Sequence, residues 1–135
     1  MRHANDSAYK IGASSWSSTR RCAGCVTPFL GTHPQYELAK RQMRGGGTVV
    51  TFELDADGDA GKQRAFQVLD GTSLIDISNN LGRLQVAHHP PGYPPRTGPW
   101  GRRPGGDRLS DGVVRLSVGL ESTDDLIADL ERALG

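Results

Sequence analysis

The residues with the most apparent chemical potential are two cysteines at a two-residue spacing, Cys22-Ala-Gly-Cys25, with His33 further along the chain. Redox pairs and zinc sites both use this spacing. A structural zinc normally takes four ligands, and the chain has no second CxxC. A thioredoxin-like pair would follow a strand and open a helix, and no such pattern surrounds these cysteines. We therefore expect no metal site, although His88 and His89 could join the cysteines if the fold brought them together.

Three consecutive glycines, Gly45, Gly46 and Gly47, suggest a phosphate-binding loop. The run lacks the Gly-Lys-Ser/Thr ending of such loops and precedes a strand, instead of joining a strand to a helix. A turn is the better interpretation.

Residues 83–108 form a run rich in proline, glycine and arginine, with six of the eight prolines and five arginines against one aspartate. Such a run can stay extended and bind RNA or a partner protein. Nucleic-acid binders usually interleave stacking aromatic residues, however, and this run offers only Tyr93 and Trp100.

The remaining segments have the periodicity of elements that could position functional residues. A helix is expected within 32–43, with Thr32 as a possible N-cap and Pro34 in its first turn. Strands are expected over 47–55, 73–79 and 111–121, and helices over 60–71 and 122–135. Residues 1–12 could end a helix, whereas 13–27 show neither helical nor strand periodicity.

The apolar positions of these segments predict the buried faces. In the last helix, Ser122 or Thr123 is expected to cap the first turn. Residues expected to face inward are Val50, Phe52 and Leu54; Ala65, Phe66, Val68 and Leu69; and Leu126, Ile127, Leu130 and Leu134. A weaker stripe comprises Tyr36, Leu38, Ala39 and Met43. The order of elements predicts an α/β fold whose short sheet carries helices on one side and covers something else.

Length and composition limit the classes of protein to which the chain can belong. A chain of 135 residues is one ordinary domain or part of a larger one, and a net charge of +1 gives no global argument for nucleic acid or an acidic membrane. No apolar run approaches the ~20 residues of a membrane span, and the first residues contain no signal-peptide core. Two cysteines do not make a secreted disulfide framework, so the expected location is cytoplasmic.

Three segments, "GTHPQYELAKRQMRGGGTVVTFEL", "LIDISNNLG" and "DGVVRLSVGLESTDDLIADLERAL", resemble the C-terminal domain of the pyridoxal-phosphate (PLP) enzymes of cysteine and methionine metabolism. The Asn-Asn-Leu-Gly variant at 79–82 is most similar to the O-succinylhomoserine sulfhydrylases. The resemblance implies the small domain of a fold-type I PLP enzyme, with a short, mainly antiparallel sheet, helices on one side and an irregular insert at about 83–108.

The resemblance also implies a chemistry and a site. In the family, PLP forms a Schiff base with a lysine and then with the substrate amine, and sulfide or a thiol replaces the group on the γ-carbon. Arg115, in "VVRLSVG", is implied to bind the substrate α-carboxylate, a role that suits a planar guanidinium. Asn79 and Asn80 match the loop beside the substrate. The alternatives are a surface arginine on an edge strand and a turn that ends a strand.

Two atypical segments, 13–27 and 83–108, suggest a further hypothesis. Permitted codons for "RLQVAHHPPGY" and "ASSWSSTRRC", read in another frame, give peptides that resemble the family at those places. Both segments are therefore interpreted as frame-shifted coding sequence, which the nucleotide sequence would test. The threonine and histidine that the family carries near the active site after Gly82 are missing.

The expected function is that of a fragment of a PLP-dependent sulfhydrylase of methionine biosynthesis, which contributes α-carboxylate binding and is inactive alone. No motif for the Schiff-base lysine, the pyridine-nitrogen aspartate, the phosphate-binding residues or the large domain is present, and Lys10, Lys40 and Lys62 stand in the wrong contexts. PLP is thus expected in the family but not on this chain alone. The resemblance implies a homotetramer that binds an amino-acid substrate, an assembly that is not expected of this chain. The alternatives are a non-catalytic partner subunit and a small RNA- or metal-binding protein.

Overall fold

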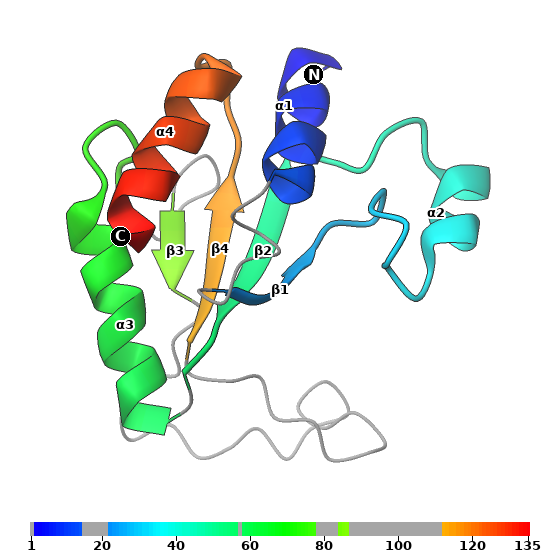
Figure 1. Cartoon of the computed structure of the whole chain (residues 1–135). Helices are drawn as coiled ribbons and strands as arrows, with labels where there is room; N and C mark the ends of the chain where they lie inside the picture. Colours follow the sequence, from blue (N-terminus) through cyan, green and yellow to red (C-terminus); the bar gives the residue numbers. More distant parts are fainter. Residues whose placement is uncertain (1, 15–21, 57, 78–83, 87–111) are drawn as a thin grey trace.

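The computed structural model describes residues 2–14, 22–56, 58–77, 84–86 and 112–135, and these residues form an α/β unit of four helices and four strands (Figure 1). In chain order the elements are α1 (Arg2–Ala13), β1 (Cys22–Val26), α2 (Tyr36–Gln42), β2 (Val49–Leu54), α3 (Gly58–Gly71), β3 (Leu84–Val86), β4 (Val113–Ser117) and α4 (Thr123–Leu134). The predicted fold class is confirmed.

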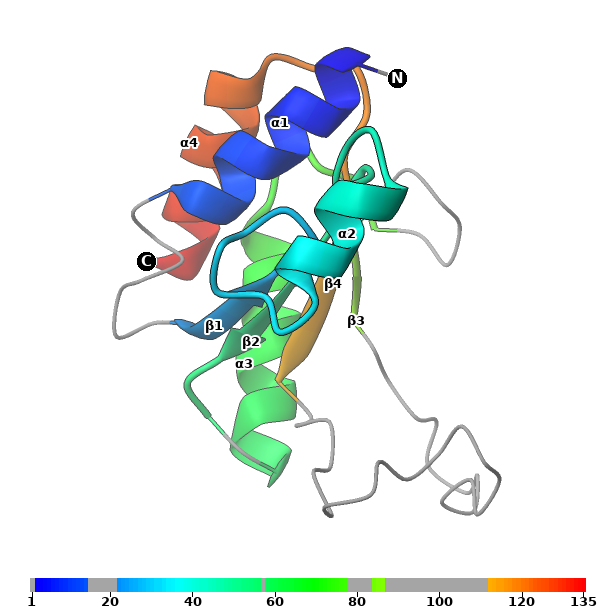
Figure 2. The ribbon, with the colours of Figure 1, turned by 90° about the vertical axis from the view of Figure 1, so that its right-hand side faces the viewer.

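The strands form one antiparallel sheet in the order β1-β2-β4-β3, so β2 and β4 are its inner strands. Their register pairs Thr51 with Arg115 and Phe52 with Val114. Helices α1, α3 and α4 lie on one face of this sheet, as predicted, while α2 stands apart beyond β1 (Figure 1 and Figure 2). A buried hydrogen bond of 2.7 Å between the hydroxyls of Ser7 and Thr123 joins α1 to the start of α4.

The core lies between the sheet and the three helices that cover it. Successive residues of β2 alternate between half-buried and buried, because side chains of a strand point to opposite faces. The helix-covered face of the two inner strands is formed by Val50, Phe52, Leu54, Val114 and Leu116, each at most 1% exposed. Opposite them α4 presents Leu126, Leu130 and Leu134, which are buried as predicted, with Ile127 packed against the cluster.

The helices follow the sequence patterns closely, with two corrections. Ser122 caps α4, since its hydroxyl accepts a hydrogen bond from the backbone N–H of Asp125 at 3.5 Å. In α3 the expected inward residues are buried except Phe66, which is 43% exposed because it lies at the border of the apolar stripe. Helix α2 begins at Tyr36, and its N-cap is Gln35, so the predicted cap at Thr32 is wrong.

The segment before α2 explains that difference. Residues 28–35 form consecutive turns in which the backbone N–H of His33 bonds to the carbonyl of Leu30 and that of Tyr36 bonds to the carbonyl of His33. Thr32 and Pro34 are therefore used in turns. Of the weak apolar stripe only Ala39 is buried, while Leu38 and Met43 are 38% and 41% exposed. The glycines follow the end of α2, and Gly47 adopts a φ of 84°, as the predicted turn requires.

Three strand predictions need correction. Residues 22–26 form β1, although 13–27 showed no strand periodicity, because a bulge between Cys22 and Gly24 breaks the alternation. Leu84–Val86 forms β3 within the insert expected to be irregular. The strand expected over 73–79 does not form over 73–77, where Ile77 alone makes a single bridge, because the backbone N–H groups of 73–75 bond elsewhere.

Among the described residues, no helix is both long enough and apolar enough to cross a membrane.

Candidate functional site

Arg115 occupies the middle of β4. Its Cα partner on one side is Thr51 of β2, and its partner on the other side is Gln85 of β3. The strand is therefore an inner one, and the alternative interpretation of Arg115 as an edge-strand residue is wrong. Inner strands are held by ladder hydrogen bonds on both sides, so the segment of β4 around Arg115 has a paired strand on each side.

The side chain of Arg115 projects from the sheet face opposite the helices. Its neighbours Val114 and Leu116 face the core, so alternation along the strand places Arg115 on the other face together with Val113 and Ser117. Val113 and Ser117 are 4% and 7% exposed, and Arg115 is half-buried. A partly desolvated guanidinium attracts a carboxylate more strongly than one in open water, because the effective dielectric constant is lower. The arrangement can thus bind a carboxylate through two parallel N–H donors.

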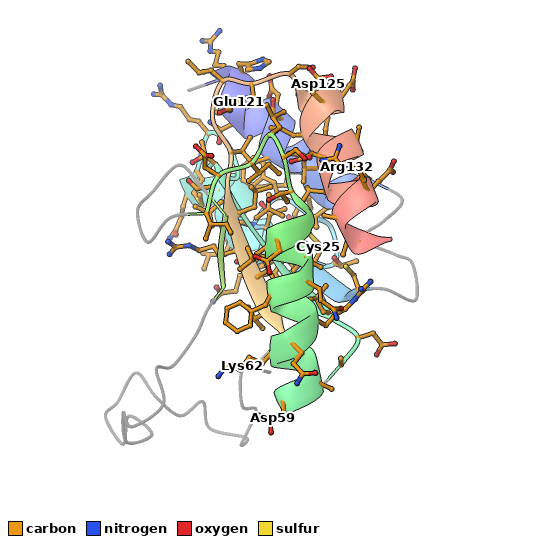
Figure 3. The ribbon with its side chains drawn as sticks, turned by 90° about the vertical axis from the view of Figure 1, so that its left-hand side faces the viewer. Cys25, Asp59, Lys62, Glu121, Asp125 and Arg132 are labelled. Atoms are coloured by element: carbon orange, nitrogen blue, oxygen red, sulfur yellow. The ribbon has the colours of Figure 1, made fainter. Side chains whose placement is uncertain are left out.

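A cleft of about 240 Å³ opens at the end of β4 that follows Arg115. One wall is formed by residues 74–76 and the other by residues 116–119, with Glu121 and Leu126 completing the lining. Figure 3 shows Glu121 on the connection that leads into α4. The cleft therefore shares Leu116 and Ser117 with the strand that carries Arg115.

Asp129 on α4 organises the first of these walls, and sequence reasoning missed it. Its carboxylate is 3% exposed and accepts backbone N–H groups from Ser73, Leu74 and Ile75, each at 3.0 Å to its nearer oxygen. Arg132, one turn further along α4, forms an ion pair with the same carboxylate and donates to the hydroxyl of Ser73 at 2.9 Å (Figure 3). The signal was present in the sequence, because an aspartate within the apolar stripe of a helix must find buried partners.

The balance of these interactions determines the pKa of Asp129. Burial alone raises the pKa, because it disfavours the charged form. The N–H donors of Ser73, Ile75 and Leu74, together with the positive charge of Arg132, outweigh burial and leave the pKa below its ordinary value. Asp129 is thus a stable anion that holds a turn in place of the strand that the sequence predicted.

Several of the predicted site residues lie outside the described part of the chain. Asn79, Asn80, Leu81 and Gly82 belong to this group, as do His88 and His89. Their roles stay predictions. The structure therefore neither brings Asn79 and Asn80 to Arg115 nor separates them from it.

Cys22 and Cys25 both face the core. They pair with Leu54 and Phe52, two residues of the core face, because the intervening bulge shifts the alternation by one position. Burial raises the pKa of both thiols to about 11. Within the described residues, no group of three or more His, Cys, Asp or Glu side chains could hold a metal ion. Protonated, desolvated thiols are poor nucleophiles and poor ligands, which favours a packing role.

The small α/β fold, with Arg115 on an inner strand, is the kind of domain that fold-type I PLP enzymes carry. The chain belongs to the family of Cys/Met metabolism PLP-dependent enzymes, whose family model matches residues 1–135.

Three relatives show how similar the chain is to individual proteins. The chain is 55% identical to an O-succinylhomoserine sulfhydrylase of Mycobacterium tuberculosis, over 99% of this chain and 33% of the relative. It is 40% identical to an L-methionine gamma-lyase of Fusobacterium nucleatum, over 79% of this chain and 26% of the relative. The crystal structure of cystathionine gamma-lyase from yeast, a fold-type I PLP enzyme, matches 98% of this chain and 33% of its own with a TM-score of 0.78 at 29% identity. The chain thus spans about a quarter to a third of the length of these relatives.

The family cofactor can be tested against the residues present. The chain has three lysines, and all three lie on helices in the described part. Lys10 and Lys40 are exposed, and Lys62 is half-buried near the start of α3 (Figure 3). No lysine lines the cleft or lies on β4 beside Arg115. These lysines do not fit a Schiff base with PLP, whereas Arg115 fits a substrate carboxylate.

Proposed function

We propose that the chain is the carboxylate-binding part of a PLP-dependent sulfhydrylase that converts O-succinylhomoserine and sulfide to homocysteine. In this proposal Arg115 binds the α-carboxylate of the amino-acid substrate. The Schiff-base lysine comes from a polypeptide segment outside these 135 residues, so the chain by itself has no transsulfuration activity.

The observation that carries the proposal is the placement of Arg115. It is a half-buried arginine on an inner strand, with a paired strand on each side and its side chain on the sheet face opposite the helices. A bidentate contact of this kind orients a substrate as well as attracting it. The choice of the O-succinyl ester follows the 55% identity to the M. tuberculosis sulfhydrylase.

The direct test is a titration of the isotope-labelled chain with O-succinyl-L-homoserine, followed by NMR. The proposal expects chemical-shift changes at Arg115 and its strand neighbours, with weak affinity because the rest of the site is absent. Arg115→Gln should abolish these changes, and Arg115→Lys should weaken binding because an ammonium cannot form the planar two-donor contact. Arg41→Gln, which removes an exposed arginine of α2, is the matched control and should bind like the parent.

A second measurement addresses the cofactor. Addition of PLP to the parent chain should give no specific lysine-dependent absorbance band. A band that disappears on substitution of Lys10, Lys40 or Lys62 would contradict the proposal that the Schiff-base lysine lies outside these 135 residues.

The ester titration has its own contradicting outcome. Binding of the ester that is unchanged in Arg115→Gln would reject Arg115 as the carboxylate site.

A further inference from the structure

The turn at residues 73–75 is built around a carboxylate that the proposed chemistry does not use. Three successive backbone N–H groups point at Asp129, and such a concave set of donors is suited to an anion. An ionised carboxylate has enough lone pairs to accept all three together with Arg132, whereas a neutral amide exposes one acceptor oxygen. The conformation of this turn therefore depends on the charge of Asp129.

The same turn lies across the cleft from the end of β4. Among the described residues, β3 pairs with β4 from Val114 to Leu116. Beyond Leu116, β4 borders the cleft, whose opposite wall is residues 74–76. Ile75 is 7% exposed and belongs to the same core cluster as Leu116. Asp129 thus sets how closely this wall approaches the strand immediately after Arg115.

We infer that Asp129 is a positioning residue for the carboxylate-binding face of β4, an inference that rests on the proposed function of Arg115. Asp129 holds residues 73–75 in place, and Ile75 belongs to the core cluster that includes Leu116. Leu116 is the residue next to Arg115 on β4, so its position bears on the direction of Arg115. A two-donor contact requires a fixed direction, because a small displacement of the guanidinium leaves one of its N–H groups misaligned. Asp129 does not itself touch the substrate.

The first test is amide hydrogen exchange on the full chain, with Asp129→Asn compared with Glu131→Gln. Both variants remove one carboxylate from α4, and Glu131 is exposed. In Asp129→Asn, under conditions where the chain stays folded, the amides of Ser73, Leu74 and Ile75 should exchange roughly ten- to a hundredfold faster, because charge-assisted bonds are lost. The amides of Ser117 and Val118 should also exchange faster, while those of Val50 and Phe52 should not change. Glu131→Gln should match the parent at every one of these positions.

The second test measures the affinity of the folded molecules for the ester. If Asp129 only stabilised the fold, this affinity would not change. O-succinyl-L-homoserine should bind Asp129→Asn at least about threefold more weakly than it binds Glu131→Gln. The difference should persist when salt is added, because it does not come from a long-range charge interaction that salt would screen. Equal affinity in the two folded variants, or exchange at Ser117 and Val118 that does not respond to Asp129→Asn, would overturn the inference. A parent chain that binds no ester rejects the proposed function instead, and the exchange measurement then decides alone whether Asp129 positions the end of β4.

Discussion

The two faces of the inner strands β2 and β4 differ in burial and in residue type. On the helix-covered face, Val50, Phe52 and Val114 are fully buried. On the opposite face, Thr51 and Arg115 stand directly across from each other, and both are half-buried. The same backbone ladder therefore carries a close-packed apolar layer on one side and, on the other, a mixed layer of apolar and polar residues that includes the cationic side chain of Arg115.

This difference indicates which residues stabilise the fold and which are available for chemistry. Apolar burial contributes stability in proportion to the area removed from water, so the helix-covered face dominates the free energy of folding. The opposite face contributes less, and a substitution there can change binding while leaving the fold intact. Asp129 links the two, because it lies in the buried layer of α4 and holds a wall of the cleft beside β4.

The largest effect should come from the packed face. Phe52→Ala removes a fully buried ring from the centre of β2 and should lower the free energy of unfolding by about 3–5 kcal/mol. Since domains are stable by only about 5–15 kcal/mol, this variant should be partly unfolded or close to it. Thr51→Ala, the adjacent position on the other face, should cost about 1 kcal/mol or less. Urea denaturation measures both, and equal losses would contradict the division between the faces.

Asp129→Asn should have the next largest effect, about 2–3 kcal/mol near neutral pH, because it removes charge-assisted bonds from a buried site. The folded-state pKa of Asp129 lies below its ordinary value, so its stabilising contribution is present above the unfolded pKa of about 3.9 and is lost as the pH falls through the folded pKa. The stability difference between parent and variant should therefore be constant from neutral pH to about pH 5 and shrink in stronger acid. A difference that grows on acidification would contradict the assignment.

The sequence predicted the elements whose stability depends on local pattern. The alternation in residues 49–54, the apolar stripe of α4 and the cap at Ser122 follow from side-chain periodicity and a single hydroxyl, and all three are confirmed. The inner faces of these elements, and the strand that carries Arg115, could thus be identified from the amino-acid pattern alone.

The elements that the sequence did not predict depend on partners far away in the chain. The expected strand at 73–79 fails over 73–77 because the N–H groups of residues 73–75 bond to Asp129, which lies 54 to 56 positions away. β1 was missed because its bulge places Cys22 and Cys25 on the same face, although their odd spacing puts them on opposite faces of a regular strand. For the site, the resemblance to the family pointed to Arg115, and no feature of the sequence indicated its neighbours across the sheet.

Arg115 should show a smaller effect on stability than either residue above. Arg115→Gln should change the free energy of unfolding by less than about 1 kcal/mol, because a half-buried polar side chain on this face contributes little apolar burial. The loss should appear in carboxylate binding instead. Urea denaturation alongside the ester titration separates the two quantities. A loss in stability comparable to that of Phe52→Ala would mean that this face is part of the packed core.

The last comparison, and the sharpest probe of how far the packed face extends, concerns the reactivity of the two thiols of β1. Because burial raises their pKa from 9.0 to about 11, the thiolate fraction at pH 8 should be about a hundredfold below that of an ordinary cysteine. Alkylation by iodoacetamide should therefore be slow in the folded chain and should accelerate by about that factor in denaturant. The raised pKa values contribute stability that is complete below the ordinary pKa of 9.0 and is lost as the pH rises toward 11. Cys22→Ser and Cys25→Ser identify which thiol reacts. If either thiol reacts at the rate of a free cysteine while the chain is folded, the core face does not extend to the edge strand, and the contrast between the two faces is confined to β2 and β4.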